Sequence, residues 1–246
     1  MSKTKHALPI VTAIAMATAG LSVHASGNDI RLSGDLAQGE FNTLVNEIGV
    51  ATAYSSIGPA ATLGITGLNL GASVTSYSIS RDVWDKSVRD GSSPSRLNMM
   101  RLHARKGLPH GFDIGATYST ATSGDLSAIG GELRKSLLDG SALTPAVSVS
   151  GHYSTVVGVS DIDLSSYGID LGISKGFALF TPFAGIGQIW YDGSESSAEV
   201  DLRSHNTSQT RTHLGMRMGL LPFMSVTAQA DFSEINSYSL RLNLGF

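Results

Sequence analysis

From about residue 63 to the end of the chain, apolar and polar residues alternate in ten segments that are separated by turn-rich connections. Successive side chains of a β-strand point to opposite faces, so each segment predicts a strand with one apolar and one polar face. Each segment is as long as, or longer than, the roughly 9–11 residues that a tilted strand needs to cross a bilayer. The ten segments are 63–79, 97–106, 110–121, 126–137, 142–156, 161–174, 177–191, 207–220, 223–233 and 236–246.

The connections between these segments are of two kinds. Those after the second, fourth, sixth and eighth segments are tight and rich in Gly or Pro, as in KGLPHG at 106–111. The connections after the first and seventh segments, 80–96 and 192–209, are long and polar. All long loops therefore fall on one side, as in outer-membrane barrels with an even number of strands. The sequence predicts an all-β fold: an antiparallel up-and-down transmembrane β-barrel of about ten strands (8–12), with a short N-terminal helix.

The polar faces of the segments carry arginines and carboxylates rather than the lysine-rich mixture of a solvated surface. Arginine paired with Asp or Glu suits a confined, hydrogen-bonded interior. We therefore expect these residues, with three histidines, to line the barrel lumen: Arg101, His103, Arg105, Asp113, Glu132, Arg134, His152, Asp170, Arg211, His213, Arg217, Asp231 and Arg241.

The aromatic residues sort by height along the predicted strands. Two aromatic belts at the two interfaces are typical of transmembrane barrels. The residues expected near the short turns are Phe112, Phe180, Phe183, Phe223 and Phe246, and those toward the long loops are Tyr118, Tyr153, Tyr167, Trp190, Tyr191, Phe232 and Tyr238. In the seventh segment apolar residues occupy both faces, so its register stays ambiguous.

The N-terminal region has a different pattern. Residues 1–25 combine Lys3 and Lys5, an apolar run and a Val23-His24-Ala25 end, which predicts a cleaved secretory signal peptide. Residues 26–61 are expected to form an N-terminal periplasmic segment with an amphipathic helix over about 35–47, capped by Ser33-Gly34-Asp35. Three placements are open to this helix: it can plug the periplasmic opening, lie on the membrane surface or pair with a partner. The barrel itself is expected over 62–246.

Composition narrows the function classes. The formal net charge of −3 argues against nucleic acid as a partner, and with no cysteine the chain has neither disulfides nor thiolate metal sites. After the signal peptide, no apolar run is long enough for a membrane-spanning helix.

The last strand carries a recognisable motif. Tyr238, Leu240, Leu242, Leu244 and Phe246 alternate with polar or small residues. This Tyr-x-Leu-x-Leu-x-Leu-x-Phe pattern resembles the C-terminal signal strand of Gram-negative outer-membrane β-barrels, and a HARKGLPHGFDIG-like hairpin at 103–115 resembles small barrels without an established activity. The resemblance implies export to the outer membrane. It also implies outer-membrane lipids, the barrel-assembly machinery and periplasmic chaperones as partners.

The residues favour a non-enzymatic protein, either structural or a narrow passage for small solutes, without a cofactor or a metal. Because ten strands enclose little space beyond side chains, a salt-bridged lumen is preferred over a wide pore. An adhesin or receptor acting through the loops 80–96 and 192–209 is an alternative, with Trp84 as an anchor or as a cover over the barrel mouth.

Two enzyme activities are further alternatives. His152 and Ser154 are similar to the His-x-Ser of lipid A deacylases, although the expected glutamate does not follow and both side chains are predicted to face inward. The loop residues Asp82, Asp85, Asp201 and His205 allow a comparison with the ten-stranded omptin proteases, but no omptin-like motif is present.

Overall fold

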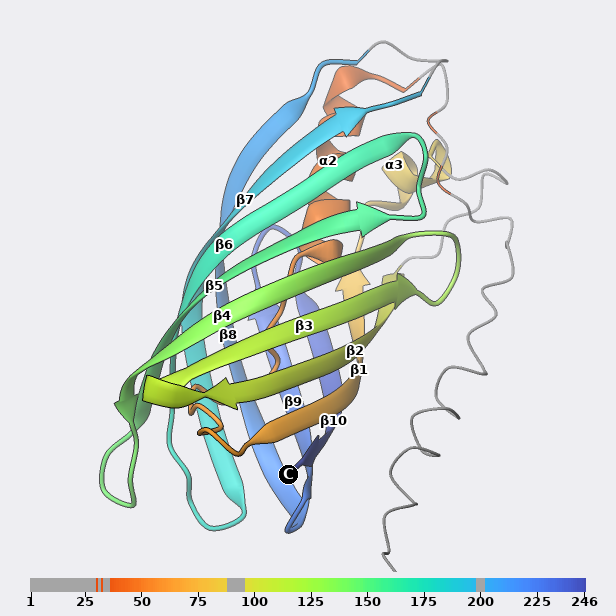
Figure 1. Cartoon of the computed structure of the whole chain (residues 1–246). Helices are drawn as coiled ribbons and strands as arrows, with labels where there is room; N and C mark the ends of the chain where they lie inside the picture. The colour runs from red at the N-terminus through yellow and green to blue at the C-terminus, as the bar shows by residue number, and fades with distance from the viewer. Residues whose placement is uncertain (1–29, 31, 33–35, 88–95, 198–201) are drawn as a thin grey trace, which may run out of the picture.

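A computed structural model of the chain describes residues 30, 32, 36–87, 96–197 and 202–246. The predicted signal peptide and the cap at 33–35 lie outside the described residues. The described chain forms a closed antiparallel barrel of ten strands, in which each strand pairs with its neighbours in sequence (Figure 1). The predicted fold class is therefore confirmed.

Every predicted segment forms a strand, with bounds that shift by a few residues. The largest shift is at the start, where residues 63–67 form a turn before the first strand. The strands are β1 (Leu68–Ser78), β2 (Arg96–Leu108), β3 (Phe112–Ala121), β4 (Ser127–Asp139), β5 (Ala146–Val157), β6 (Ile162–Ser174), β7 (Phe180–Glu195), β8 (His205–Leu221), β9 (Met224–Phe232) and β10 (Ser237–Gly245).

The barrel closes because the first strand pairs with the last. In this antiparallel pair Asn69 lies opposite Gly245 and Tyr77 lies opposite Ser237. The main chain of Leu68 also exchanges two hydrogen bonds of 2.8 Å with that of Phe246. Closure leaves no row of unpaired backbone groups at a sheet edge, as a lipid environment requires.

The outer face is a band of exposed apolar side chains. On β10, Leu240 and Leu242 are 59% and 46% exposed, whereas the alternating Ser239 and Arg241 are buried. The residues of the predicted assembly motif all lie on this outer face. Such a continuous apolar surface suits lipid rather than water. Among the described residues, no helix is long and apolar enough to cross a membrane.

Strand β7 corrects one part of the aromatic prediction. Phe183 and Tyr191 were expected in the two interface belts, but they are 5% and 1% exposed and point into the barrel. Ile189 is buried on the same inner face. Phe183 packs on His213. At Ile189 and Tyr191 the strand is apolar on both sides because one face meets lipid and the other meets an apolar element inside the barrel.

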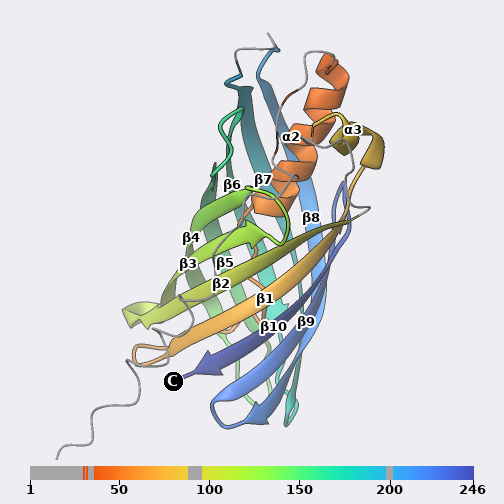
Figure 2. The ribbon, with the colours of Figure 1, turned by 90° about the vertical axis from the view of Figure 1, so that its right-hand side faces the viewer.

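That element is helix α2 (Gln38–Thr52), which begins and ends later than the predicted 35–47. The main-chain N–H of Ala37 donates to Glu40 Oε2 at the start of the helix. The helix lies within the half of the barrel next to the long loops, beside the short helix α3 (Arg81–Asp85) of the β1–β2 connection (Figures 1 and 2). The helix and the residues after it thus lie in the barrel interior, with the start of the helix at the long-loop rim. A plug was one of the three placements that the sequence left open for the helix, and it was expected at the periplasmic opening.

Candidate functional site: a lumen filled by the N-terminal segment

The half of the lumen at the long-loop end is apolar. Phe41, Leu44, Val45 and Ile48 of α2 are at most 1% exposed. They belong to one cluster with inner-face residues of the strands, among them Tyr77, Leu97, Met99, Ile162, Leu164, Ile189 and Tyr191. Burying each large apolar side chain contributes about 1.5–3 kcal/mol, so the helix is held in the barrel mainly by hydrophobic packing.

Two glycines set how closely the helix approaches the strands. A Cβ at Gly49 of α2 would lie 2.7 Å from the ring of Tyr191, and a Cβ at Gly193 of β7 would lie 2.5 Å from Val45. Both distances are shorter than a carbon–carbon contact. These two close contacts between the helix and β7 therefore require glycine at one of the two contacting positions.

A buried carboxylate joins α2 to the first long connection. Glu47 is 3% exposed and accepts hydrogen bonds from the main chain of Ser80 at 3.0 Å and from Trp84 Nε1 at 2.6 Å. Trp84 is itself buried and folds over the barrel interior, one of the two placements considered for it. The carboxylate is thereby satisfied in an otherwise apolar setting.

Beyond α2, residues 53–63 continue through the other half of the lumen without regular secondary structure. Arginines from four different strands donate to main-chain carbonyls of this path and of the last turn of α2. Arg211 Nη1 lies 3.1 Å from the oxygen of Tyr54, and Arg241 Nη1 lies 2.9 Å from that of Ile57. The other two bonds run from Arg101 to Ala51 and, at 2.9 Å, from Arg134 to Pro59.

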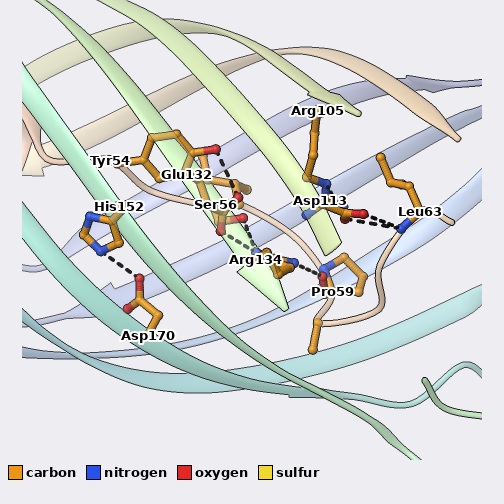
Figure 3. A network of polar contacts seen from close by, with 12 residues as sticks. Tyr54, Ser56, Pro59, Leu63, Arg105, Asp113, Glu132, Arg134, His152 and Asp170 are labelled. Carbon is orange, nitrogen blue, oxygen red and sulfur yellow. Dashed lines mark hydrogen bonds and ion pairs between the residues drawn. The ribbon is translucent and has the colours of Figure 1, made fainter. Parts of the chain in front are cut away.

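Carboxylates hold two of these arginines in place: Glu132 of the same strand, β4, pairs with Arg134 (Figure 3), and Asp170 of β6 pairs with Arg211 of β8. Arg134 Nη2 lies 3.0 Å from Glu132, whose other oxygen accepts a hydrogen bond from Tyr54 OH at 3.2 Å. Arg211 Nη2 lies 2.9 Å and 3.1 Å from the two oxygens of Asp170. Arg134 and Arg211 thus each join a strand carboxylate to the threaded segment.

A third carboxylate lies where the segment leaves the lumen. Asp113 accepts two hydrogen bonds from the main-chain N–H of Leu63, at 3.0 Å and 3.2 Å, and lies 3.5 Å from Arg105 Nε. Nearby, the N–H of Ala60 donates to Ser174 Oγ at 3.1 Å.

All thirteen residues of the predicted lumen set lie on strand positions that alternate with exposed outward residues. The network around the threaded segment brings together Arg101, Arg105, Asp113, Glu132, Arg134, His152, Asp170, Arg211 and Arg241. Asp231 accepts from Gln229 Nε2 at 3.0 Å and 3.1 Å. Arg105, His213 and Arg217 are only partly buried.

The three histidines have separate environments. His103 Nε2 lies 2.9 Å from Ser73 Oγ, and His213 packs at a tilt on Phe183. His152 stacks on Tyr54 and lies 3.0 Å from Asp170. Within the described ranges, no group of three or more His, Asp or Glu side chains is arranged to hold a metal ion.

The residues of the two enzyme hypotheses are also placed. His152 and Ser154 are buried on the inner face, and Ser154 Oγ donates to the carbonyl of Thr52 at 3.1 Å, so neither side chain meets lipid. Asp82 and Asp85 lie on α3, His205 Nε2 lies 3.1 Å from Asn46 Oδ1, and Asp201 is outside the described residues.

Little open space remains inside. In the described part of the chain, a cavity of about 20 Å³ lies between the segment and inner-face residues that include Arg134, Asp170 and Arg211. That volume holds about one water molecule. A larger recess of about 370 Å³ opens at the long-loop end, lined by residues of β5 to β8 such as Asp163 and Asp192.

The sequence interpretation missed the residues that the segment itself contributes. Glu47, Tyr54 and Ser56 were not singled out, because in a segment outside the barrel these side chains would have no contacts with the strands. An acidic residue within the apolar stripe of the predicted helix was the available signal.

Comparisons with known proteins give likeness in shape only. No family model matches the chain, and no curated protein matches it. Among solved structures, the KdgM porin has a TM-score of 0.40 at 10% identity, covering 72% of this chain and 99% of that one. The Ail protein of Yersinia pestis has a TM-score of 0.37 at 10% identity, covering 74% and 99%. A de novo designed transmembrane barrel has a TM-score of 0.35 at 8% identity, covering 77% and 98%.

The closed sheet and its apolar outer band define the class of the protein. It is a transmembrane β-barrel of the outer-membrane type.

Proposed function

We propose that this protein is a structural barrel of a Gram-negative outer membrane, and that it does not conduct solutes while its N-terminal segment is in place. The observation that carries the proposal is the filled lumen: α2 occupies one half, and residues 53–63, held by three arginines, occupy the other. Of the two roles expected from the sequence, this favours the structural one over passage of small solutes.

The same proposal covers the route to the membrane. Export by the signal peptide, delivery by periplasmic chaperones and recognition of β10 by the barrel-assembly machinery are the steps implied by the sequence motifs. The outward position of Tyr238, Leu240, Leu242, Leu244 and Phe246 supports such recognition, because these side chains are available at the surface of a nascent strand.

Conductance in planar bilayers tests the closed lumen. We expect the purified full-length protein to show no stable openings at neutral or acidic pH. Leu44→Asp places a charge in the apolar half of the lumen, where it has no partner, and is expected to release the helix and produce openings. Ala37→Asp is the matched control, because Ala37 is exposed at the N-terminus of the same helix. Stable openings of the unmodified protein would refute the proposal.

The membrane location has its own test. Heat-modifiable migration on a gel and recovery in the outer-membrane fraction are expected. A protein that migrates alike with and without boiling, and fractionates with the soluble periplasm, would contradict the location whatever the conductance shows.

A further inference from the structure

The N-terminal segment contacts all five connections at the long-loop end of the barrel. Its first described residues cross two of them: the N–H of Ile30 donates to Asp125 in the β3–β4 connection, and the N–H of Leu32 donates to Asp161 in the β5–β6 connection, both at 3.2 Å. Ile30 and Leu32 therefore lie at the rim of the barrel.

The helix makes the other three contacts. Gln38 exchanges hydrogen bonds of 3.0 Å and 2.9 Å with the main chain of Arg203 in the β7–β8 connection. Asn46 Nδ2 donates to Glu234 in the β9–β10 connection at 3.1 Å, and Glu47 binds the β1–β2 connection as described above. The start of α2 is thus fixed among the long loops.

The segment leaves at the opposite end. Leu63 is bound by Asp113, which is the second residue of β3 and lies beside the short turn after β2. A Cβ at Gly107 would lie 1.7 Å from the carbonyl oxygen of Gly64, so the exit path touches the last residues of β2. The order of contacts from Ile30 to Leu63 therefore runs from the long-loop rim to the short-turn rim.

The bonds from the arginines in the middle of this path are directed at the main chain. Carbonyl oxygens are present at every residue, so these bonds hold an extended chain with little dependence on its side chains. The lumen is therefore suited to hold an extended polypeptide, and the protein's own chain occupies it.

We propose that the barrel carries its own N-terminal segment through the outer membrane, so that Ile30, Leu32 and the start of α2 lie on the outer side, beside the long loops. This rests on the proposed outer-membrane location, in which we place the long loops outward because outer-membrane barrels have short periplasmic turns and longer extracellular loops. Export delivers the chain to the periplasm, so the strands must close around the segment during assembly, with its N-terminal end on the outer side. The exposed start of α2, at Gly39, would then face the surroundings of the cell.

Single cysteines test the inference, because the natural chain has none. Gly39→Cys reports on the start of α2: Gly39 is exposed, and a Cβ there meets no atom within 4 Å. Ser204→Cys, exposed in the β7–β8 connection, reports on the long-loop side. Leu143→Cys, 91% exposed in the β4–β5 connection, reports on the short-turn side. Intact and lysed cells are treated with a maleimide attached to a polymer too large to pass outer-membrane channels.

We expect Gly39→Cys and Ser204→Cys to react fully on intact cells and Leu143→Cys to react only after lysis. Labelling of Ser204→Cys with protection of Gly39→Cys would overturn the inference and leave the proposed function standing. Labelling of Leu143→Cys alone on intact cells would show that the barrel has the opposite orientation and would overturn the inference. If none of the three reacts until lysis, the outer-membrane location falls as well.

Discussion

The two halves of the lumen are built from the same alternating strands but hold the N-terminal segment in different ways. At the long-loop end, strand residues such as Met99 and Ile189 pack on the apolar face of α2. At the short-turn end, arginines and carboxylates surround a segment without regular structure. The inner face of a strand therefore matches whatever fills the lumen at that height, and is not polar throughout.

The comparison also explains why arginines outnumber carboxylates on the inner face. The predicted set holds six arginines against four carboxylates. Four of those arginines donate to carbonyl oxygens, which are neutral acceptors supplied by the segment. Buried charged pairs add little net stability, but directional bonds fix the segment at one height in the barrel. The apolar half thus contributes most of the free energy that holds the segment, and the polar half fixes the height of the segment in the barrel.

The largest effect is expected in the polar half, for Arg211→Met. Removing the guanidinium leaves Asp170 buried beside His152 and frees the carbonyl of Tyr54, which destabilises the packed segment by about 3–5 kcal/mol. The measurement is urea-induced loss of Trp84 fluorescence in a Trp190→Phe background, since the chain has two tryptophans and Trp84 contacts α2 through Glu47.

Arg217→Met is the matched control on the same strand. Within the described ranges, the side chain of Arg217 has no hydrogen bond or ion pair, and we expect a change below about 1 kcal/mol. Equal effects of the two substitutions would show that the arginine–carbonyl bonds do not hold the segment.

In the apolar half, Leu44→Ala is expected to destabilise the docked helix by roughly 3 kcal/mol, because the side chain is fully buried and leaves a cavity. The loss should not depend on salt. Leu242→Ala removes the same side chain from the outer face and should leave the Trp84 transition unchanged. A salt-dependent loss for Leu44→Ala would contradict the division between the two halves.

Tyr54→Phe is a smaller perturbation of the polar half. It removes the hydroxyl that donates to Glu132, while Arg134 still pairs with that carboxylate, so we expect a loss of about 1 kcal/mol in the same urea experiment. Tyr153→Phe, on the outer face, is the control. A loss as large as that of Arg211→Met would mean that Tyr54 has a structural role beyond this bond.

The smallest effect is expected at the rim. Lys86 Nζ lies 2.5 Å from Glu40, but both side chains are partly exposed. Lys86→Met should cost less than about 1 kcal/mol at low salt, and the difference should vanish at high salt because exposed charges are screened. A difference that persists at high salt would place this pair among the buried contacts.

The sequence predicted the strands because alternation follows from a sheet with two unlike sides, and the charged positions followed from the same alternation. It did not predict the position of α2, because a helix with one apolar stripe packs equally well on many apolar surfaces. The apolar inner face of β7, with Ile189 and Tyr191, carried the missing information. That pattern was ambiguous because a lumen was expected to be polar at every height.

A disulfide between α2 and β7 tests the central claim, a lumen filled by the N-terminal segment, most directly. A Cβ at Gly193 would lie 2.5 Å from Cγ1 of Val45, which is 0% exposed, so the pair Val45→Cys and Gly193→Cys is close enough to form a bond. Val45→Cys with Asp192→Cys is the control, since Asp192 points outward on the next residue of the strand. We predict that the first pair alone gives a mobility shift on a boiled gel that disappears on reduction. No shift for the first pair, under oxidation that links cysteines elsewhere in the barrel, would contradict a helix inside the lumen.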